Sequence, residues 1–387
     1  MSGNKSASPS RGQNIFRRRR PLQRARHIAK RLWMSSMQSA AFVEFHHRAR
    51  LLSNVIQQLS GRSAHNLKAG FTVAFAVTSN RANTAAGDYF TARELGEALE
   101  RRFGWHVRYL PMGPAWYDCD GVDAVIAMRD DYDPTRIRAP HPVLSIGWIR
   151  AWFHRWLERP GFHAFDILTA SSDSGATLVA ERSQRPVSVL RIATNPMRFL
   201  PGDAVAGFQS DVVFTGNYWA APRDVADALA HSGIDARTAV YGKGWEAVEG
   251  MRDIHRGFVP YTTIPSVYAS TKIVIDDAAH VTKPYGSVNC RVYDALASGR
   301  LALSNCQIGI AELFGSQLPT WTSAEELQHL VSHFLDFPEE REDLTRRLRD
   351  EVLTAHTYDH RAAELLEILH LHISANSARV QRPFTAA

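Results

Sequence analysis

The sequence predicts an α/β protein of two Rossmann-like domains that face a central cleft, preceded by a basic helical N-terminal extension. Three observations support this fold class. Short apolar runs alternate with amphipathic helical segments, which is typical of a doubly wound parallel sheet. The alternation stops in a stretch with two prolines and two glycines, over residues 195–209, and then restarts. Almost all of the basic excess lies in the first 66 of the 387 residues.

The chain is long enough for two ordinary domains and an additional segment. We expect four parts: the extension over 1–66, a first Rossmann-like domain over 67–200, a second over 201–357, and a last helix with a tail over 358–387. The hydrophobic share of 45% and the charged share of 22% are those of a soluble globular protein.

The first half of the predicted body alternates between strands and helices. We expect strands at 71–77, 106–110, 123–128, 142–146, 166–170 and 187–192, and helices at 88–103 and over the Trp-rich segment 148–157. The second half repeats the pattern. We expect its strands at 211–215, 236–241, 272–276 and 300–304, and its helices at 222–231, 287–298, 324–335, 339–355 and 359–373.

The net charge of +6 hides a split between the extension and the body. Residues 1–66 hold 13 Lys and Arg against the single acid Glu44, a charge of about +12, so the remaining residues carry about −6. Any partner inferred from basicity therefore belongs to the extension alone.

A helical pattern of basic and aromatic residues follows a Ser-, Gly- and Arg-rich start in this extension. Such a helix can lie on an anionic membrane surface. It can also pack on its own body or on a sister subunit, and nucleic acid is a third reading. No nucleic-acid-binding signature occurs elsewhere in the chain, so we expect no nucleic-acid partner.

The cysteines Cys119, Cys290 and Cys306 form neither a disulfide framework nor a zinc motif, which favours a reducing compartment. No apolar run is long enough to span a bilayer, and the basic start lacks the apolar core of a secretory signal. We therefore expect a cytoplasmic protein, with attachment to the inner face of the membrane as one use of the extension.

Four landmarks in the second half carry a family resemblance. The first two are the strand ends Val213-Phe-Thr-Gly-Asn-Tyr and Val240-Tyr-Gly-Lys-Gly-Trp. The third is Tyr268-Ala-Ser-Thr-Lys-Ile-Val-Ile-Asp, and the fourth is Gly286-Ser-Val-Asn-Cys-Arg-Val-Tyr-Asp-Ala-Leu-Ala-Ser-Gly-Arg. In order and spacing they resemble the C-terminal domain of GT-B glycosyltransferases, most closely the spore-maturation-protein-like group.

The resemblance implies a glycosyltransferase, hexosyltransferase-like and metal-independent, that uses a UDP- or GDP-linked sugar as co-substrate and needs no other cofactor. It also implies that the first domain holds the acceptor and that the last helix crosses back to it. The residues expected to bind the nucleotide sugar are Gly216, Asn217, Tyr241, Gly242, Gly244, Trp245, Gly286, Ser287, Asn289, Arg291 and Asp294.

Elementary chemistry supports the fourth landmark as a donor site. We expect Gly286 and Ser287 to open a helix, whose free N–H groups and positive end attract an anion such as a diphosphate. Arg291, one turn later, then offers a forked contact to phosphate, and Asp294 accepts from ribose hydroxyls. The family has Glu more often at this acid. The apolar residues of the same helix are expected to be core.

The catalytic candidates are Asp88, Arg223 and Lys243. Asp88 follows the first strand and either acts as a base on an acceptor hydroxyl or caps the next helix. Arg223 and Lys243 follow strands of the second sheet, where a cation stabilises a leaving diphosphate. A solvated Arg223, and a glycine pair around Lys243 that only makes a tight turn, are the structural alternatives.

Other features are expected to be structural. Asp118 and Asp120 imitate a metal-binding Asp-x-Asp motif, and a second acidic cluster lies over 130–133, but both precede or follow strands as turn acids do. We therefore expect no metal site. Four tryptophans, at 116, 148, 152 and 156, form either core or a wall for stacking a sugar or a lipid.

The expected acceptor is a growing surface polysaccharide or a lipid-linked glycan, which the extension would help the enzyme to reach. Two alternatives remain at the level of sequence. One is a sugar-nucleotide epimerase of the same fold, and the other is a non-catalytic scaffold or binding protein that has kept the fold.

Overall fold

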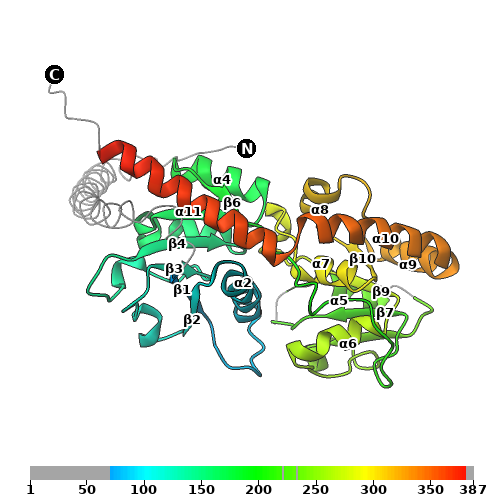
Figure 1. Ribbon diagram of the computed structural model, residues 1–387. Helices are drawn as coiled ribbons and strands as arrows, with labels where there is room; N and C mark the ends of the chain where they lie inside the picture. The colour runs from blue at the N-terminus through cyan, green and yellow to red at the C-terminus, as the bar shows by residue number, and fades with distance from the viewer. Residues whose placement is uncertain (1–69, 220–221, 232–233, 381–387) are drawn as a thin grey trace, which may run out of the picture. The chain divides into compact units, whose positions relative to one another are not determined.

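The computed structural model describes residues 70–219, 222–231 and 234–380 (Figure 1). The extension predicted over residues 1–66 lies outside these described residues. Within them, the structure has two separate parallel sheets flanked by helices. The predicted α/β class with two Rossmann-like sheets is thus confirmed for this part of the chain.

The first sheet has six strands in the order β2-β1-β3-β4-β5-β6, and all neighbouring strands are parallel. Its strands are β1 Thr72–Val77, β2 His106–Pro111, β3 Ala124–Ala127, β4 Leu144–Ile149, β5 Ile167–Ala170 and β6 Ser188–Val189. Its helices are α2 Gly87–Phe103, α3 Phe153–Glu158 and α4 Asp173–Ser183. The strands β3, β4 and β5 are almost continuously apolar and buried, as expected for a sheet covered on both faces.

The second sheet has four parallel strands in the order β10-β9-β7-β8. Its strands are β7 Val212–Thr215, β8 Thr238–Tyr241, β9 Ile273–Asp276 and β10 Leu301–Ser304. The helices that follow or flank them are α5 Asp224–His231, α6 Ile264–Ala269, α7 Cys290–Ala297, α8 Gln307–Phe314, α9 Ala324–Asp336 and α10 Pro338–Ala355. All strands run parallel, so the loops that follow β7, β8, β9 and β10 gather at one edge of the sheet, where α/β proteins bind ligands.

The last helix, α11 Tyr358–Val380, contacts α2 of the first half (Figure 1). Asp359, in its first turn, forms an ion pair with Arg101 of α2. The backbone at Thr357, just before the helix, also pairs with that at Thr194. The end of the chain therefore returns to the element that follows the first strand.

Most predicted elements occur within a few residues of their expected positions, but two helices begin later than expected. A helix over 148–157 is wrong at its start, because Trp148 lies in β4 and pairs with Thr169 of β5. The helix α3 begins only at Phe153. The apolar run that ends β4 continues into the helical segment, so periodicity alone does not separate the two.

The structure also decides between core and wall for the four tryptophans. Trp116, Trp148 and Trp156 are at most 4% exposed and belong to the core. Only Trp152 is exposed, at 38%, and its backbone is left-handed with φ at 58°. Its main-chain N–H donates to the carbonyl of Val281, at 3.1 Å.

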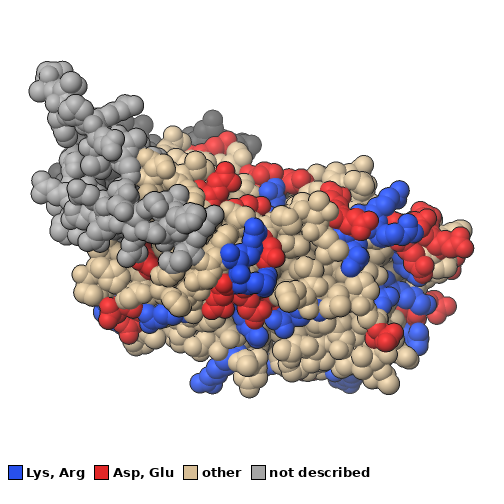
Figure 2. Space-filling view, viewed as in Figure 1, with Lys and Arg blue, Asp and Glu red and all other residues tan. Residues whose placement is uncertain are grey.

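On the face drawn in Figure 2, the acidic and basic side chains are interspersed rather than gathered into a patch of one sign. No helix among the described residues is both long and apolar enough to cross a bilayer.

Candidate functional site

Two loops at the carboxyl edge of the second sheet approach each other closely. These are residues 216–219 after β7 and residues 242–245 after β8, together called the β7/β8 loop pair. A Cβ atom built on Gly242 would lie only 2.0 Å from the carbonyl oxygen of Gly216, so only glycine fits there. The indole N–H of Trp245 donates to the same oxygen, at 2.6 Å.

The polar backbone groups of this loop pair are largely paired with each other. The N–H of Gly216 donates to the carbonyl of Tyr241, and the N–H of Lys243 donates to the side-chain oxygen of Asn217, both at 2.9 Å. Gly244 has a left-handed backbone with φ at 87° and lies against Tyr218. The structure thus brings the seven predicted residues of this region into one assembly. These hydrogen bonds hold the two loops together, and none of them involves the ammonium group of Lys243.

Lys243 is the charged residue of the loop pair. Its side chain is exposed, and its ammonium lies 4.7 Å from the centre of the Phe258 ring. No acid of the described ranges forms an ion pair with it. An exposed ammonium on a rigid loop at this edge is available to an anionic ligand.

Two buried ion pairs lie directly beneath the loop pair. Arg291 of α7 meets Asp276, the last residue of β9, at 2.6 Å, and Arg223 meets the next acid, Asp277. Burial opposes the charge on Arg291, but the carboxylate of Asp276 still raises the pKa of this arginine above its usual value. Burial also raises the pKa of Asp277, although Arg223 acts against that. The two positive charges are therefore already balanced by two negative ones.

Arg291 and Arg223 also support the loop pair directly. Arg291 donates through Nε to the carbonyl of Thr215, at 2.7 Å, and Arg223 donates to the carbonyl of Asn217, at 3.3 Å. A Cβ atom on Gly216 would lie 2.9 Å from Nη2 of Arg291, so this glycine leaves room for the guanidinium. The role of Arg291 as a phosphate ligand remains a prediction. What the structure shows is a guanidinium engaged with Asp276 and the end of β7.

The expected helix over residues 287–298 starts too early. The structure begins α7 at Cys290, and Asn289 is its N-cap, with a side chain that accepts from the N–H of Arg291 at 3.0 Å. Gly286 instead ends a short 3₁₀ turn, with φ at 67°. Asn is among the best N-capping residues, so the helix begins after Asn289 rather than at Gly286. Asn289 therefore marks the start of this helix, and its side chain already occupies the N–H of Arg291.

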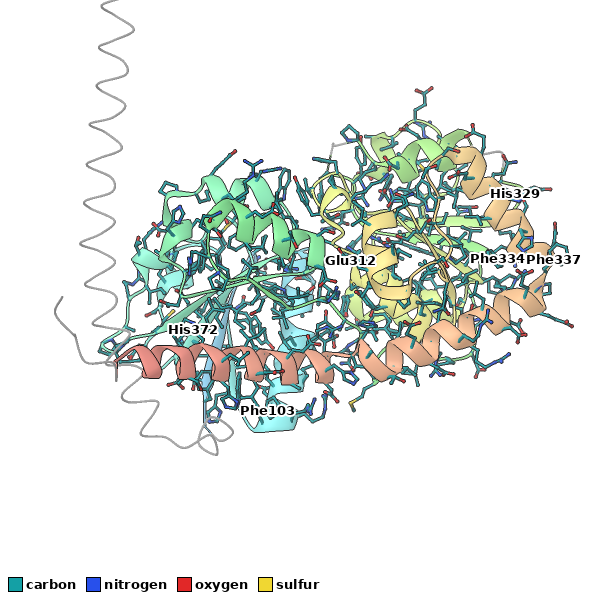
Figure 3. The ribbon with its side chains drawn as sticks, turned by 90° about the horizontal axis from the view of Figure 1, so that it is seen from above. Phe103, Glu312, His329, Phe334, Phe337 and His372 are labelled. Carbon is teal, nitrogen blue, oxygen red and sulfur yellow. The ribbon has the colours of Figure 1, made fainter. Side chains whose placement is uncertain are left out.

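Ser287 points to the first half of the chain. Its hydroxyl donates to the carbonyl of Arg150, at 2.8 Å, and lies 2.6 Å from the hydroxyl of Ser171. Arg150 follows β4 and Ser171 follows β5, so the 286–287 loop meets the carboxyl edge of the first sheet. Nearby, Glu312 of α8 (labelled in Figure 3) accepts from the N–H of Ser174, at 2.8 Å.

Asp294 is buried one turn further along α7 and bonds to the first half as well. The hydroxyl of Thr194 donates to its carboxyl group, at 2.7 Å. Burial raises the pKa of Asp294 well above the ordinary value, against the effect of that hydrogen bond. Its predicted contact with ribose remains a prediction, and it would involve a carboxyl group that burial drives toward the neutral form.

Asp88 lies in the first turn of α2 and is not its N-cap, which is Ala86. Its carboxylate accepts from both the N–H and the hydroxyl of Thr78, at 2.7 and 2.8 Å. The loop before α2 also reaches the second sheet, since the side-chain amide of Asn217 donates to the carbonyl of Ala85, at 3.1 Å. The capping alternative is thus wrong, and a catalytic role for Asp88 remains a prediction.

Two acids of the cluster over 130–133 form ion pairs with arginines. Asp130 is buried and pairs with Arg159 at 2.7 Å, and Asp131 pairs with Arg129 at 2.8 Å. The described residues contain no group of three or more His, Cys, Asp or Glu side chains placed to hold a metal ion.

Four residues of this region were not predicted as site residues: Asp276, Asp277, Asn305 and Arg150. Asp276 and Asp277 end an apolar strand as an adjacent pair of acids, and that position is a usable signal in the sequence. Asn305 follows β10 and donates to Asp277, at 2.7 Å. Arg150 follows β4 in the same way. In all four cases the signal in the sequence is a polar residue at or directly after the carboxyl end of a buried parallel strand.

Comparison with known proteins agrees with this arrangement. A family model described as glycosyl transferase-like matches residues 221–367, which include α5, the 242–245 loop, β9 and α7. No curated protein matches the sequence.

Several solved structures share the fold. The glycosyltransferase AviGT4, involved in avilamycin A biosynthesis, is 16% identical with a TM-score of 0.56, over 79% of this chain and 98% of that one. Alr3699/HepE of Anabaena, in complex with UDP and glucose, is 10% identical with a TM-score of 0.57, over 78% of this chain and 100% of that one. A sucrose-phosphate synthase from Thermosynechococcus elongatus is 12% identical with a TM-score of 0.55, over 79% and 100% of the two chains.

Proposed function

We propose that this protein transfers a sugar from a nucleotide-sugar donor to an acceptor hydroxyl, because a family model described as glycosyl transferase-like matches residues 221–367 and the chain shares its fold with solved glycosyltransferases. The observation that carries the proposal is the exposed ammonium of Lys243, which forms no ion pair with an acid of the described residues. It belongs to the β7/β8 loop pair, in which the two loops approach so closely that position 242 must be glycine. It lies at the edge of the second sheet that binds ligands in α/β folds.

The donor diphosphate would lie over this loop pair and the start of α7. Arg223 and Arg291 are each balanced by an aspartate, so Lys243 supplies the net positive charge for the leaving group. A preorganised charge of this kind stabilises the transition state without a metal ion. A UDP-linked sugar is the first donor to test, because the similarly folded HepE structure contains UDP. GDP is the second.

The first half would hold the acceptor, with Asp88 as its catalytic candidate. If the reaction inverts the anomeric centre, a base must take the acceptor proton, and Asp88 follows the first strand at the carboxyl edge of its sheet. The carboxylate is held by Thr78, so its position is defined before the acceptor arrives.

Replacing Lys243 by Ala should lower kcat/KM for a UDP- or GDP-sugar by about 10²- to 10³-fold, because the leaving diphosphate loses its net counter-charge. Release of nucleoside diphosphate from a panel of UDP- and GDP-sugars measures the effect. Lys243→Arg should recover part of the activity, since it restores the charge in a different shape.

The matched control is Lys272→Ala. Lys272 is a lysine of the same sheet, but it precedes β9 and pairs with Asp211 at the opposite edge. This variant should keep wild-type turnover. Equal activity of the Lys243→Ala enzyme and the wild type would remove the main support for the donor site.

A non-catalytic binding protein is the second candidate. The observation in its favour is that Asp294 is bonded to Thr194 and that Arg223 and Arg291 are already paired. A nucleotide-induced rise in melting temperature without turnover of any donor would support it. The absence of both effects would contradict both candidates.

We further propose that the acceptor is a surface polysaccharide or a lipid-linked glycan, and that residues 1–66 bring the enzyme to the cytoplasmic face of an anionic membrane. The charge split in the sequence supports this. Replacing the four arginines at positions 17–20 by Gln should weaken binding to phosphatidylserine vesicles by about 10³-fold, since each charge contributes about 1 kcal/mol. Binding to phosphatidylcholine vesicles serves as the control. Equal sedimentation of both proteins with the anionic vesicles would contradict the membrane role.

A further inference from the structure

Arg150 is a half-buried cation that forms no ion pair with any residue the structure describes. It directly follows β4, at the carboxyl edge of the first sheet. Its Nη2 donates to the carbonyl of Met128, at 3.1 Å, whereas its Nε is buried and has no hydrogen-bond partner. Within the described ranges no carboxylate forms an ion pair with it. A guanidinium whose Nε is buried without an acceptor is unfavourable unless something else supplies that acceptor.

The surroundings of Arg150 act on its charge in two directions. Burial lowers the pKa of Arg150, and this effect outweighs the opposite influence of Asp88, Tyr358 and Cys290. Asp88 is the carboxylate among these groups, but it holds Thr78 and forms no ion pair with Arg150.

Arg150 is also connected to the expected donor loop. Its carbonyl accepts from the hydroxyl of Ser287, at 2.8 Å, and that hydroxyl contacts Ser171, at 2.6 Å. The unpaired guanidinium therefore belongs to a residue that is bonded to the loop before α7. By contrast, Arg223 and Arg291 on the second sheet are each neutralised by an aspartate.

We propose that Arg150 binds an anionic group of the donor, either a phosphate oxygen of the diphosphate or a carboxylate on the transferred sugar. The inference rests on the proposed function in so far as the donor is a nucleotide sugar. A bound anion would supply the acceptor that Nε lacks and the negative charge with which Arg150 forms no ion pair among the described residues.

The test replaces Arg150 by Gln in the full chain. Isothermal titration should show about 10- to 100-fold weaker binding, the loss expected for a charged hydrogen bond. The probes are UDP, UDP-glucose, UDP-glucuronate and inorganic pyrophosphate. Weaker binding of all four assigns the diphosphate, whereas weaker binding of UDP-glucuronate alone assigns a sugar carboxylate. Unchanged affinity for all four overturns the proposal.

Stability separates binding from a structural role. Without ligand, the Arg150→Gln protein should be at least as stable as the wild type, because a buried donor atom without an acceptor has been removed. Arg185→Gln is the matched control. Arg185 is bonded to main-chain carbonyls, including that of Phe165, at the opposite edge of the same sheet. This variant should lose stability and keep its affinity. If Arg150→Gln instead lost stability at unchanged affinity, Arg150 would be structural.

The outcome for the wild type distinguishes the two proposals. Wild-type protein that binds pyrophosphate through Arg150 but turns over no nucleotide sugar would disprove the transferase and leave the anion site standing. Wild-type protein that binds none of the four probes but releases diphosphate from a GDP-sugar would overturn the anion site and leave the transferase standing.

Discussion

Replacing Arg291 by Met is expected to lower the free energy of unfolding by about 3–5 kcal/mol, because the carboxylate of Asp276 would stay buried without its partner. Asp276 is fully buried, and its second oxygen already accepts from Ser304, at 2.6 Å. The hydrogen bond from Arg291 to the carbonyl of Thr215 would be lost as well. Urea unfolding followed by circular dichroism measures the change.

The control for this prediction is the double variant with Arg291→Met and Asp276→Asn. It removes both charges and keeps a side chain that can bond to Ser304, so it should recover most of the lost stability. If the double variant is as unstable as the single one, the loss comes from packing against Phe214, over whose ring Arg291 lies at 4.6 Å. A single variant within 1 kcal/mol of the wild type would contradict the buried pair itself.

Replacing Gly242 by Ala is expected to destabilise the protein by about 3–5 kcal/mol, through the combined cost of overpacking and a strained backbone. The added Cβ would lie 2.0 Å from the main-chain oxygen of Gly216, which cannot yield as a side chain can. The bond from Trp245 to that oxygen would be displaced too. The variant should therefore unfold at lower urea concentration and lose donor binding together with stability.

Gly207→Ala is the matched control for Gly242→Ala. Gly207 also has a left-handed backbone, with φ at 90°, but a Cβ atom there would meet nothing within 4 Å. It should lose only about 1 kcal/mol, the backbone cost alone. Equal losses at the two positions would show that the β7/β8 loop pair opens to accept the methyl group.

Much of the fold could be predicted from the sequence because its strands are short apolar runs between turn residues. The strands of the second sheet were expected within two residues of where they begin and end. The helix α4 was not expected, because its segment has a weak apolar periodicity and a glycine, Gly175, near its start. Its start is visible only through Ser172, whose side chain caps the helix by accepting from Gly175.

The candidate site could be predicted in its motif residues but not in its charge balance. The glycine-rich turns after β7 and β8 were found, and the structure places them in one loop pair. The sequence does not reveal that Arg223 and Arg291 meet Asp277 and Asp276, since these residues lie 54 and 15 positions apart. Which cation is neutralised depends on how β9 packs against α7, and local pattern carries no information on that.

The bonds that join the 171–174 segment to the second half are of two kinds. Ser171 contacts Ser287, and Ser172 donates to the carbonyl of Tyr285. Asp173 and Ser174 donate through their N–H groups to the carboxylate of Glu312, which is largely buried. Dissolved ions screen partly buried contacts of this kind much less than the attraction between an exposed ammonium and a diphosphate, which weakens as the Debye length shrinks. The ionic-strength dependence of donor affinity should therefore report mainly the contacts made with the ligand.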